Sequence, residues 1–124
     1  MDLTPVTTAG RQIVERYGSS GFRVSGIIYP GSVLVFPDRT VPWEAESASD
    51  VTLDTLTPVI EHGGVEILLL GLGRSASVVP TALRSALRAT KIALEPMETG
   101  AACRTYNVLV AEDRRVAAAL IRPS

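Results

Sequence analysis

Apolar residues in the second half of the chain alternate between short continuous runs and helical spacings. Val65–Leu70 is almost entirely apolar, which predicts a central strand covered on both faces. Ile92–Leu94 and Val116–Ile121 are shorter apolar runs and predict two further strands. With the intervening segments at helical spacing, the order from residue 53 is helix, strand, helix, strand, helix, strand. Such alternation predicts a mostly parallel sheet with right-handed crossovers.

Three helices are expected beside this sheet. The first spans residues 53–62 and ends at Gly63-Gly64. The second begins at Pro80, because proline suits the first position of a helix. In the third, Thr99 is expected to be the N-cap. One face of this third helix carries apolar residues at a 3.6-residue period: Ala102, Cys103, Tyr106, Leu109 and Val110.

The first half of the chain has the alternation and turn residues of an antiparallel arrangement. Phe22–Tyr29 and Ser32–Phe36 predict two strands that pair as a hairpin across Pro30-Gly31. Thr40–Trp43 predicts a short edge strand, because Pro42 cannot donate a hydrogen bond inside a sheet. The first 20 residues are expected to form an irregular arm. Together the two halves predict an α/β fold with a mixed sheet.

Composition narrows the class of protein. A chain of 124 residues is long enough for one domain, here residues 1–124, and too short for two. The net charge of -1 and the scattered basic residues give no reason to expect nucleic-acid binding. One cysteine and one histidine predict no disulfide, no metal site and no cofactor. The absence of a signal-like start and of a long apolar run predicts a soluble cytoplasmic protein without a membrane span.

Polar residues gather after two of the predicted parallel strands. The loops Gly71–Val79 and Glu95–Thr99 should face each other at one sheet edge, where open α/β sheets bind ligands. Free N–H groups at the start of the third helix suit an anionic small molecule. The candidate ligand-binding residues are Gly71, Gly73, Arg74, Ser75, Glu98, Thr99, Arg104 and Asn107, with Ser77 and Glu95 as further polar groups. Alternatively, the glycines form turns, Thr99 caps its own helix and the carboxylates pair with arginines.

Four other features allow a chemical interpretation and a structural one. Gly71–Ala76 matches the pattern G-x-G-x-x-A, but Pro80 places the next helix too late for a dinucleotide site. Cys103 is either a nucleophile near a helix start or a small buried residue. His62 is expected to be solvated or to interact with the helix dipole rather than to catalyse. Trp43 is either a core residue or an exposed contact residue.

Several segments resemble the small Mth-type domain family, which includes mitochondrial complex I assembly factor 3 and the adipogenesis-associated Mth-domain protein. They are Gly21-Phe22-Arg23-Val24 with Gly26, Gly31-Ser32, Trp43, Leu68–Gly73, Met97–Asn107 and Arg115–Leu120. This chain has Gly71-Leu72-Gly73 where the family usually has Gly-Thr-Gly, which removes a hydroxyl from the candidate site. The resemblance implies a three-layer α/β fold with a mixed central sheet.

Two functions are consistent with these observations. The first is a non-enzymatic protein-binding or assembly module, because no complete catalytic set is visible and the mitochondrial family member is a protein-binding assembly factor. The second is an anion-binding protein or enzyme that uses the cleft between Gly71–Gly73 and the helix start at Thr99. The first requires a protein partner, and the second requires an anionic small molecule.

Overall fold

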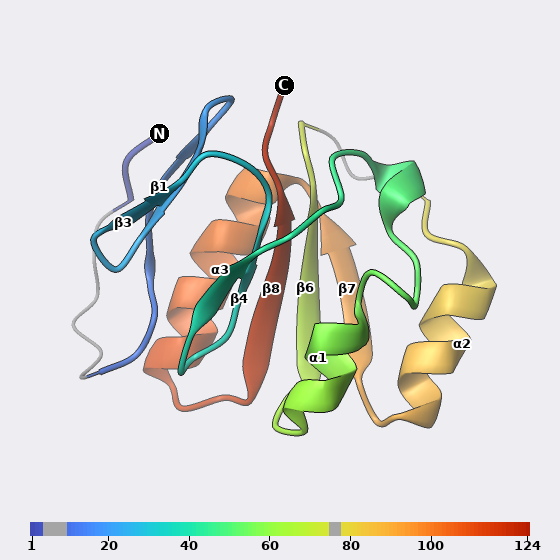
Figure 1. The fold of residues 1–124 in the computed structure, drawn as a ribbon. Helices are drawn as coiled ribbons and strands as arrows, with labels where there is room; N and C mark the ends of the chain where they lie inside the picture. The colour runs from blue at the N-terminus through green and yellow to red at the C-terminus, as the bar shows by residue number, and fades with distance from the viewer. Residues whose placement is uncertain (4–9, 75–77) are drawn as a thin grey trace.

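The structure is a computed structural model that describes residues 1–3, 10–74 and 78–124 (Figure 1). Its strands are β1 (Val14–Gly18), β2 (Gly21–Val24), β3 (Ile27–Tyr29), β4 (Val33–Val35), β5 (Thr40–Pro42), β6 (Ile67–Leu72), β7 (Ala93–Met97) and β8 (Val116–Ile121). Its helices are α1 (Thr57–His62), α2 (Thr81–Ala89) and α3 (Thr99–Ala111), with a 3₁₀ turn η1 (Ala48–Asp50). The predicted alternation of helices and strands from residue 53 is therefore confirmed.

The strands form a five-stranded sheet in the order β5-β4-β8-β6-β7 and a three-stranded sheet in the order β1-β2-β3. β6 is parallel to β7 and β8, whereas β4 is antiparallel to β8 and β5, so the larger sheet is mixed. Helices α1 and α2 cover one of its faces, and α3 with the three-stranded sheet covers the other (Figure 1). The three-layer α/β fold is confirmed.

The two hydrophobic clusters on either side of the five-stranded sheet are built by alternation along β6. Leu68 and Leu70 pack in the cluster that contains residues of α1 and α2. Leu69, between them, packs in the cluster that contains residues of α3, β1 and β2. All three side chains are buried, because helices or strands cover both faces of this strand. The predicted central strand is thus present, and it ends two residues later than Leu70.

The predicted hairpin between residues 22–29 and 32–36 is wrong. A two-residue turn at Ser25 and Gly26, with φ values of 45° and 87°, divides the first segment into β2 and β3, which pair with each other. Positive φ at both central residues is the feature of a type I′ hairpin turn. The Gly26 N–H donates to Glu15 Oε1 at 2.7 Å, and this bond holds the turn against β1. β4 pairs instead with β5 and β8.

The expected irregular arm contains the strand β1. Its pairing with β2 changes register between Val14 and Arg16, which places the inward-facing Val14 and Tyr17 three residues apart. This irregularity hides the two-residue period by which a strand is recognised. At the other edge of the fold, Pro42 lies in the edge strand β5, as predicted. The predicted helix 53–62 is shorter, because α1 begins at Thr57.

Candidate functional site

The loops that follow β6, β7 and β8 meet at one edge of the five-stranded sheet, uppermost in Figure 1. All three parallel strands end there, so this is the edge at which open α/β sheets bind ligands. A hollow of about 410 Å³ lies at this edge. It is lined by Met1, Tyr17, Gly18, Ser19, Gly73, Arg74, Glu98, Gly100, Pro123 and Ser124. The hollow is therefore shared between the ends of the parallel strands and the turn that joins β1 to β2.

Thr99 closes the cleft that the sequence places between the Gly71–Gly73 loop and the start of α3. Its N–H donates to the Gly73 carbonyl at 2.8 Å, and its hydroxyl accepts from the Gly73 N–H at 2.8 Å. A Cβ atom added to Gly71 would lie 3.0 Å from the Thr99 Cα, so the two segments are already in contact. The amide of Thr99 is consequently occupied by the protein backbone and is not free for an anion.

The prediction that Thr99 is the helix N-cap is wrong. Glu98 occupies that position, and Thr99 is the first residue of α3. The Thr99 hydroxyl donates to the Ile121 carbonyl at 2.5 Å, at the end of β8. The Thr99 hydroxyl thus bonds the ends of two other segments, from a position inside the helix and not at its cap. Thr99 therefore ties together the chain at the ends of β6, β7 and β8.

Polar side chains at the hollow interact with one another across the start of α3. Arg104 lies 3.9 Å from Glu98 Oε1 through one guanidinium nitrogen and donates to the Tyr17 hydroxyl at 3.4 Å through another. Arg74 donates through Nε to the backbone carbonyl of Ser124. Glu98 and Arg104 are about half exposed, with side-chain exposures of 51% and 54%, so their ion pair contributes little to stability.

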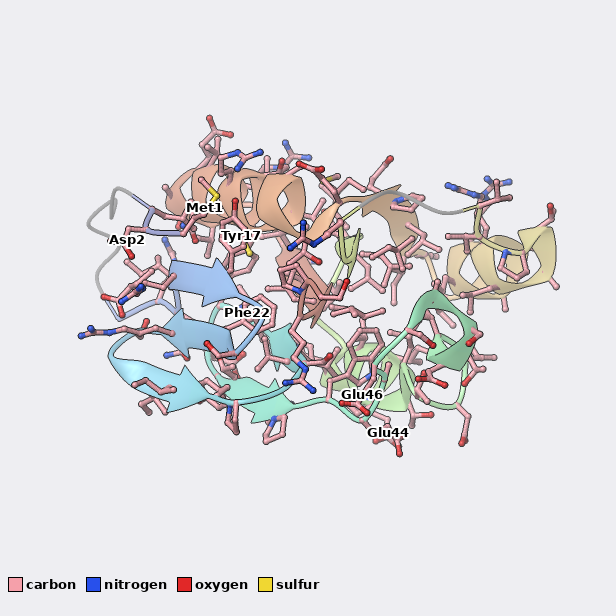
Figure 2. The ribbon with its side chains drawn as sticks, turned by 90° about the horizontal axis from the view of Figure 1, so that it is seen from above. Met1, Asp2, Tyr17, Phe22, Glu44 and Glu46 are labelled. Carbon is pink, nitrogen blue, oxygen red and sulfur yellow. The ribbon has the colours of Figure 1, made fainter. Side chains whose placement is uncertain are left out.

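Tyr17 also lines the hollow, although no sequence pattern singled it out. Figure 2 shows Met1 and Tyr17 beside the first turns of α3. A Cβ atom at Gly100 would lie 2.5 Å from the Tyr17 hydroxyl oxygen, so glycine is needed for this close approach. The sequence contains both Tyr17 and Gly100, but no local pattern shows that these two distant residues are in contact in the fold.

The sequence-predicted site residues are distributed over three locations. Gly73, Arg74 and Glu98 line the hollow, with Arg104 3.9 Å from Glu98 Oε1, and Gly71 and Thr99 are in contact with each other. Asn107 is elsewhere: it is buried and bonds the Val14 backbone, with its Oδ1 accepting at 3.0 Å and its Nδ2 donating at 2.8 Å. Ser75 and Ser77 lie outside the described residues.

The remaining candidates have structural roles away from the hollow. Trp43 is buried and donates through Nε1 to the Thr55 carbonyl at 2.8 Å, which makes it a core residue. His62 stacks on Phe36 with ring centroids 4.6 Å apart, and its Nε2 lies 2.8 Å from Asp38 Oδ1. The hydrogen bond to His62 is the main reason that the pKa of Asp38 is lowered.

The site lacks the features of a metal centre or a dinucleotide site. Within residues 1–3, 10–74 and 78–124, no group of three or more His, Cys, Asp and Glu side chains is placed to hold a metal ion. The glycine motif does not open a helix, because Leu72 still belongs to β6 and α2 begins at Thr81. Across the same described ranges, every helix is too short or too polar to cross a membrane.

Cys103 is buried on the inner face of α3 and is expected to be unreactive in the folded protein. Burial raises the pKa of its thiol to about 12, so the thiolate is scarce at neutral pH. We expect negligible alkylation of the native protein by iodoacetamide at pH 8 and complete alkylation in denaturant, both measured by mass spectrometry. Rapid labelling of the native protein, with folding verified by circular dichroism, would contradict this structural role.

Residues 14–121 match a family model described as a protein of unknown function (DUF498/DUF598). The chain is 35% identical to an uncharacterized protein of Rhodobacter capsulatus over 114 residues, covering 91% of this chain and 86% of the relative. It is 32% identical over 111 residues to the human protein named NADH dehydrogenase [ubiquinone] 1 alpha subcomplex assembly factor 3. That match covers 89% of this chain and 60% of the human protein. The chain spans about 60% of the length of such assembly-factor relatives.

Solved structures share this fold. A Bartonella henselae structure described as an outer membrane protein has a TM-score of 0.85 and 35% identity, covering 93% of this chain and 98% of its own. A Bordetella pertussis protein described as a Mth938-like domain has a TM-score of 0.83 and 25% identity, covering 98% of this chain and 92% of its own. The resemblance to Mth-type domains is confirmed.

Proposed function

Because the chain belongs to the DUF498/DUF598 family of proteins of unknown function, with complex I assembly factors among its relatives, we propose that it is a non-enzymatic protein-binding assembly module. The observation that carries the proposal is the relationship itself, which extends over about nine-tenths of the chain. The protein would hold a folding or assembling subunit through surface contacts.

The candidate site supports this proposal because the polar groups of Thr99 are bonded to other parts of the chain and are not free for a small ligand. The backbone groups that a small anion would need at Thr99 are bonded to Gly73 and Ile121. The described residues around the hollow include neither a histidine nor a cysteine. These residues therefore do not provide a Ser–His or Cys–His pair, the two common forms of an activated nucleophile. We keep two further predictions from the sequence. They are a single domain over residues 1–124 and a cytoplasmic location.

Quantitative affinity capture tests the proposal. The full chain, tagged and expressed in its own organism at its native level, is expected to retain a stoichiometric partner after washing. A partner that belongs to a NADH dehydrogenase, or to its assembly intermediates, would match the relatives named above. A tagged unrelated protein of similar size and charge is the control for background binding.

Recovery of the chain without any specific partner would contradict the assembly function and favour the second candidate, binding of a small anion in the hollow. The observation that favours this alternative is that Arg74 and Glu98 line the hollow and that Arg104 lies 3.9 Å from Glu98 Oε1. In that case, phosphate or a dicarboxylate would raise the melting temperature of the wild type but not that of Arg104→Ala.

A further inference from the structure

β3 forms one edge of the three-stranded sheet, because it pairs with β2 on one side only. In Figure 2 it is the outermost strand of this small sheet. Its three residues are Ile27, Ile28 and Tyr29, and it is followed by Pro30. An edge strand presents unpaired backbone groups to which another chain can bond.

The hairpin geometry determines which backbone groups of β3 face outward. Val24 and Ile27 flank the two-residue turn, so they form a hydrogen-bonded pair across β2 and β3. Antiparallel pairs alternate, so the next pair, Arg23 and Ile28, is not hydrogen-bonded. The N–H and C=O of Ile28 therefore point away from β2. Within the described ranges, neither group has a recorded backbone partner.

The side chains around this free backbone are apolar and exposed. Ile28 is 75% exposed, and Ile27 is 58% exposed. Because consecutive residues of a strand point to opposite faces, an added strand would meet an isoleucine on each face. Ile28 also borders a hollow of about 390 Å³, which extends over Arg23 and Phe22 towards Tyr17. This hollow provides space for a side chain of a docked strand.

The edge strand β7 is protected against pairing. The Ala93 N–H donates to the Glu66 carbonyl, so Ala93 faces β6 and the alternate residues Leu94 and Pro96 face outward. Proline has no N–H to offer, and the Leu94 carbonyl accepts from Arg84 at 2.8 Å. Proline and a charged side chain are devices by which natural sheets block their edges. The Leu94 carbonyl is thus bonded, and the Leu94 N–H is the one backbone group of this residue that faces outward without a partner in the described part of the chain.

The edges at β5 and β1 are protected too. The outward-facing residues of β5 are Thr40 and Pro42; Pro42 lacks a donor, and the Thr40 carbonyl accepts from the Tyr29 hydroxyl at 3.5 Å. The outer side of β1 is covered by residues 1–3, with the Leu3 N–H donating to the Glu15 carbonyl at 3.0 Å. β3 carries similar protection beside Ile28, because Pro30 lacks an N–H and its carbonyl accepts from Arg122 at 3.4 Å. Among the edges that the structure describes, Ile28 is therefore the position at which both backbone groups face outward without a partner and the side chain is apolar and exposed.

We propose that β3 is a docking edge for an extended, uncharged strand of a partner protein, which bonds the Ile28 backbone and covers Ile27 and Ile28. This proposal rests on the proposed protein-binding function. The strand is uncharged because β3 carries no charge and the neighbouring Arg23 is already paired with Glu15 at 3.2 Å. Backbone bonds supply affinity, and alternate side chains supply specificity, in this mode of recognition.

A second copy of the chain fits this edge less well than a different protein. Two copies joined through β3 alone would bury two isoleucines and one backbone unit each, far below the roughly 800 Å² per partner of a stable interface. Any strand docked at β3 therefore needs further contacts in the adjoining hollow, and we assign the strand to a different protein whose other segments supply them. This partner would occupy the surface around Ile28 and Arg23.

The test compares two lysine substitutions in the capture experiment above. Ile28→Lys places a charge at the free edge, and Val108→Lys places the same charge at an apolar residue on α3 that is 54% exposed. We expect Ile28→Lys to reduce the amount of recovered partner at least about tenfold, because the apolar contact at Ile28 is lost and the affinity falls. Val108→Lys is expected to leave recovery within about twofold, a small change on the same scale. Circular dichroism and melting temperature verify folding of both variants.

Hydrogen exchange on the purified complex identifies the contact directly. The amide of Ile28 is expected to exchange more slowly in the complex than in the free protein. The amide of Leu94, which also faces outward from an edge strand, is the matched control and should not change. Protection of Leu94 with no protection of Ile28 would place the partner at β7 and overturn the proposal.

The outcomes separate this inference from the proposed function. If no partner is captured, both are overturned. If a partner is captured equally well by Ile28→Lys, the β3 edge is overturned and the assembly function stands. If the purified chain alone forms a dimer in sedimentation experiments and Ile28→Lys abolishes it, the occupant is a second copy and the partner-strand proposal fails.

Discussion

Thr99→Val is expected to lower the free energy of unfolding by about 2–4 kcal/mol, because it leaves two backbone groups without partners. The Thr99 hydroxyl donates to the Ile121 carbonyl and accepts from the Gly73 N–H. Valine has nearly the same shape, so the substitution removes these bonds without leaving a large cavity. An unsatisfied buried backbone group such as the Ile121 carbonyl costs about 1–3 kcal/mol, and the partly buried Gly73 N–H adds about 1 kcal/mol because water can reach it. Urea denaturation of the purified protein measures the difference.

Thr99→Ser is the control for this effect, because serine keeps the hydroxyl and loses only a methyl group. We expect it to cost about 1 kcal/mol, the value of one buried methyl(ene) group. Equal stability of the valine and serine variants would show that the hydroxyl does not hold the ends of β6 and β8 together. The Thr99→Val variant should also perturb the hollow, since Gly73 and Glu98 line it on either side of Thr99 in the fold.

Asn107→Asp is expected to destabilise the protein by about 3 kcal/mol at pH 7, because a buried acceptor replaces a buried donor. The Asn107 Nδ2 donates to the Val14 carbonyl at 2.8 Å and attaches β1 to α3. A carboxylate oxygen in that place would face the carbonyl oxygen, and both would be unpaired. Urea unfolding of the variant and the wild type between pH 3 and pH 8, with the difference taken at each pH, measures the effect.

The pH dependence of the Asn107→Asp variant follows from the same contact. Burial and the facing carbonyl disfavour the charged form, so the pKa of the new carboxyl is raised in the folded state above its unfolded value of about 3.9. Stability is therefore recovered at pH values below the unfolded pKa and is lost as pH rises through the folded pKa. Protonation restores an O–H donor towards the Val14 carbonyl. The difference from the wild type should shrink at low pH.

Asn107→Leu separates titration from the loss of hydrogen bonds. Leucine is close in shape to asparagine and carries no titratable group, so this variant should be destabilised by a similar amount at every pH. Titration of Asp38 and other native groups cancels in each comparison, because the variants and the wild type share them. A pH-independent difference for Asn107→Asp would show that its side chain reaches solvent.

The contacts of Thr99 and Asn107 also show why candidate ligand-binding residues cannot be separated from structural ones along the chain. The sequence predicts that the helix start at Thr99 holds an anion through free N–H groups and that Asn107 offers a further polar contact nearby. Each instead bonds a backbone more than twenty residues away along the chain: Ile121 for Thr99 and Val14 for Asn107. The hydrogen-bond partner of a polar side chain depends on the tertiary fold, because the local spacing of residues does not specify that partner.

The sequence by itself determined the second half of the fold. The apolar run Val65–Leu70 identified the covered strand β6, and the alternation after residue 53 predicted that β6, β7 and β8 are parallel. These segments are recognisable because each obeys one period along its length and is bounded by glycine or proline. The parallel direction of these strands also predicts the sheet edge at which the hollow lies, because ligands bind at the carboxyl ends of such strands.

Only the tertiary structure decided the first half of the fold and the composition of the hollow. The register change in β1 conceals its two-residue period, and the turn at Ser25 and Gly26 interrupts what reads as one strand. Tyr17 reaches the hollow because Gly100 lacks a side chain, which is a contact between residues 83 positions apart. The open edge at Ile28 is likewise defined by which strands pair with which. Local patterns specify elements, whereas pairing partners and close approaches depend on packing between distant segments.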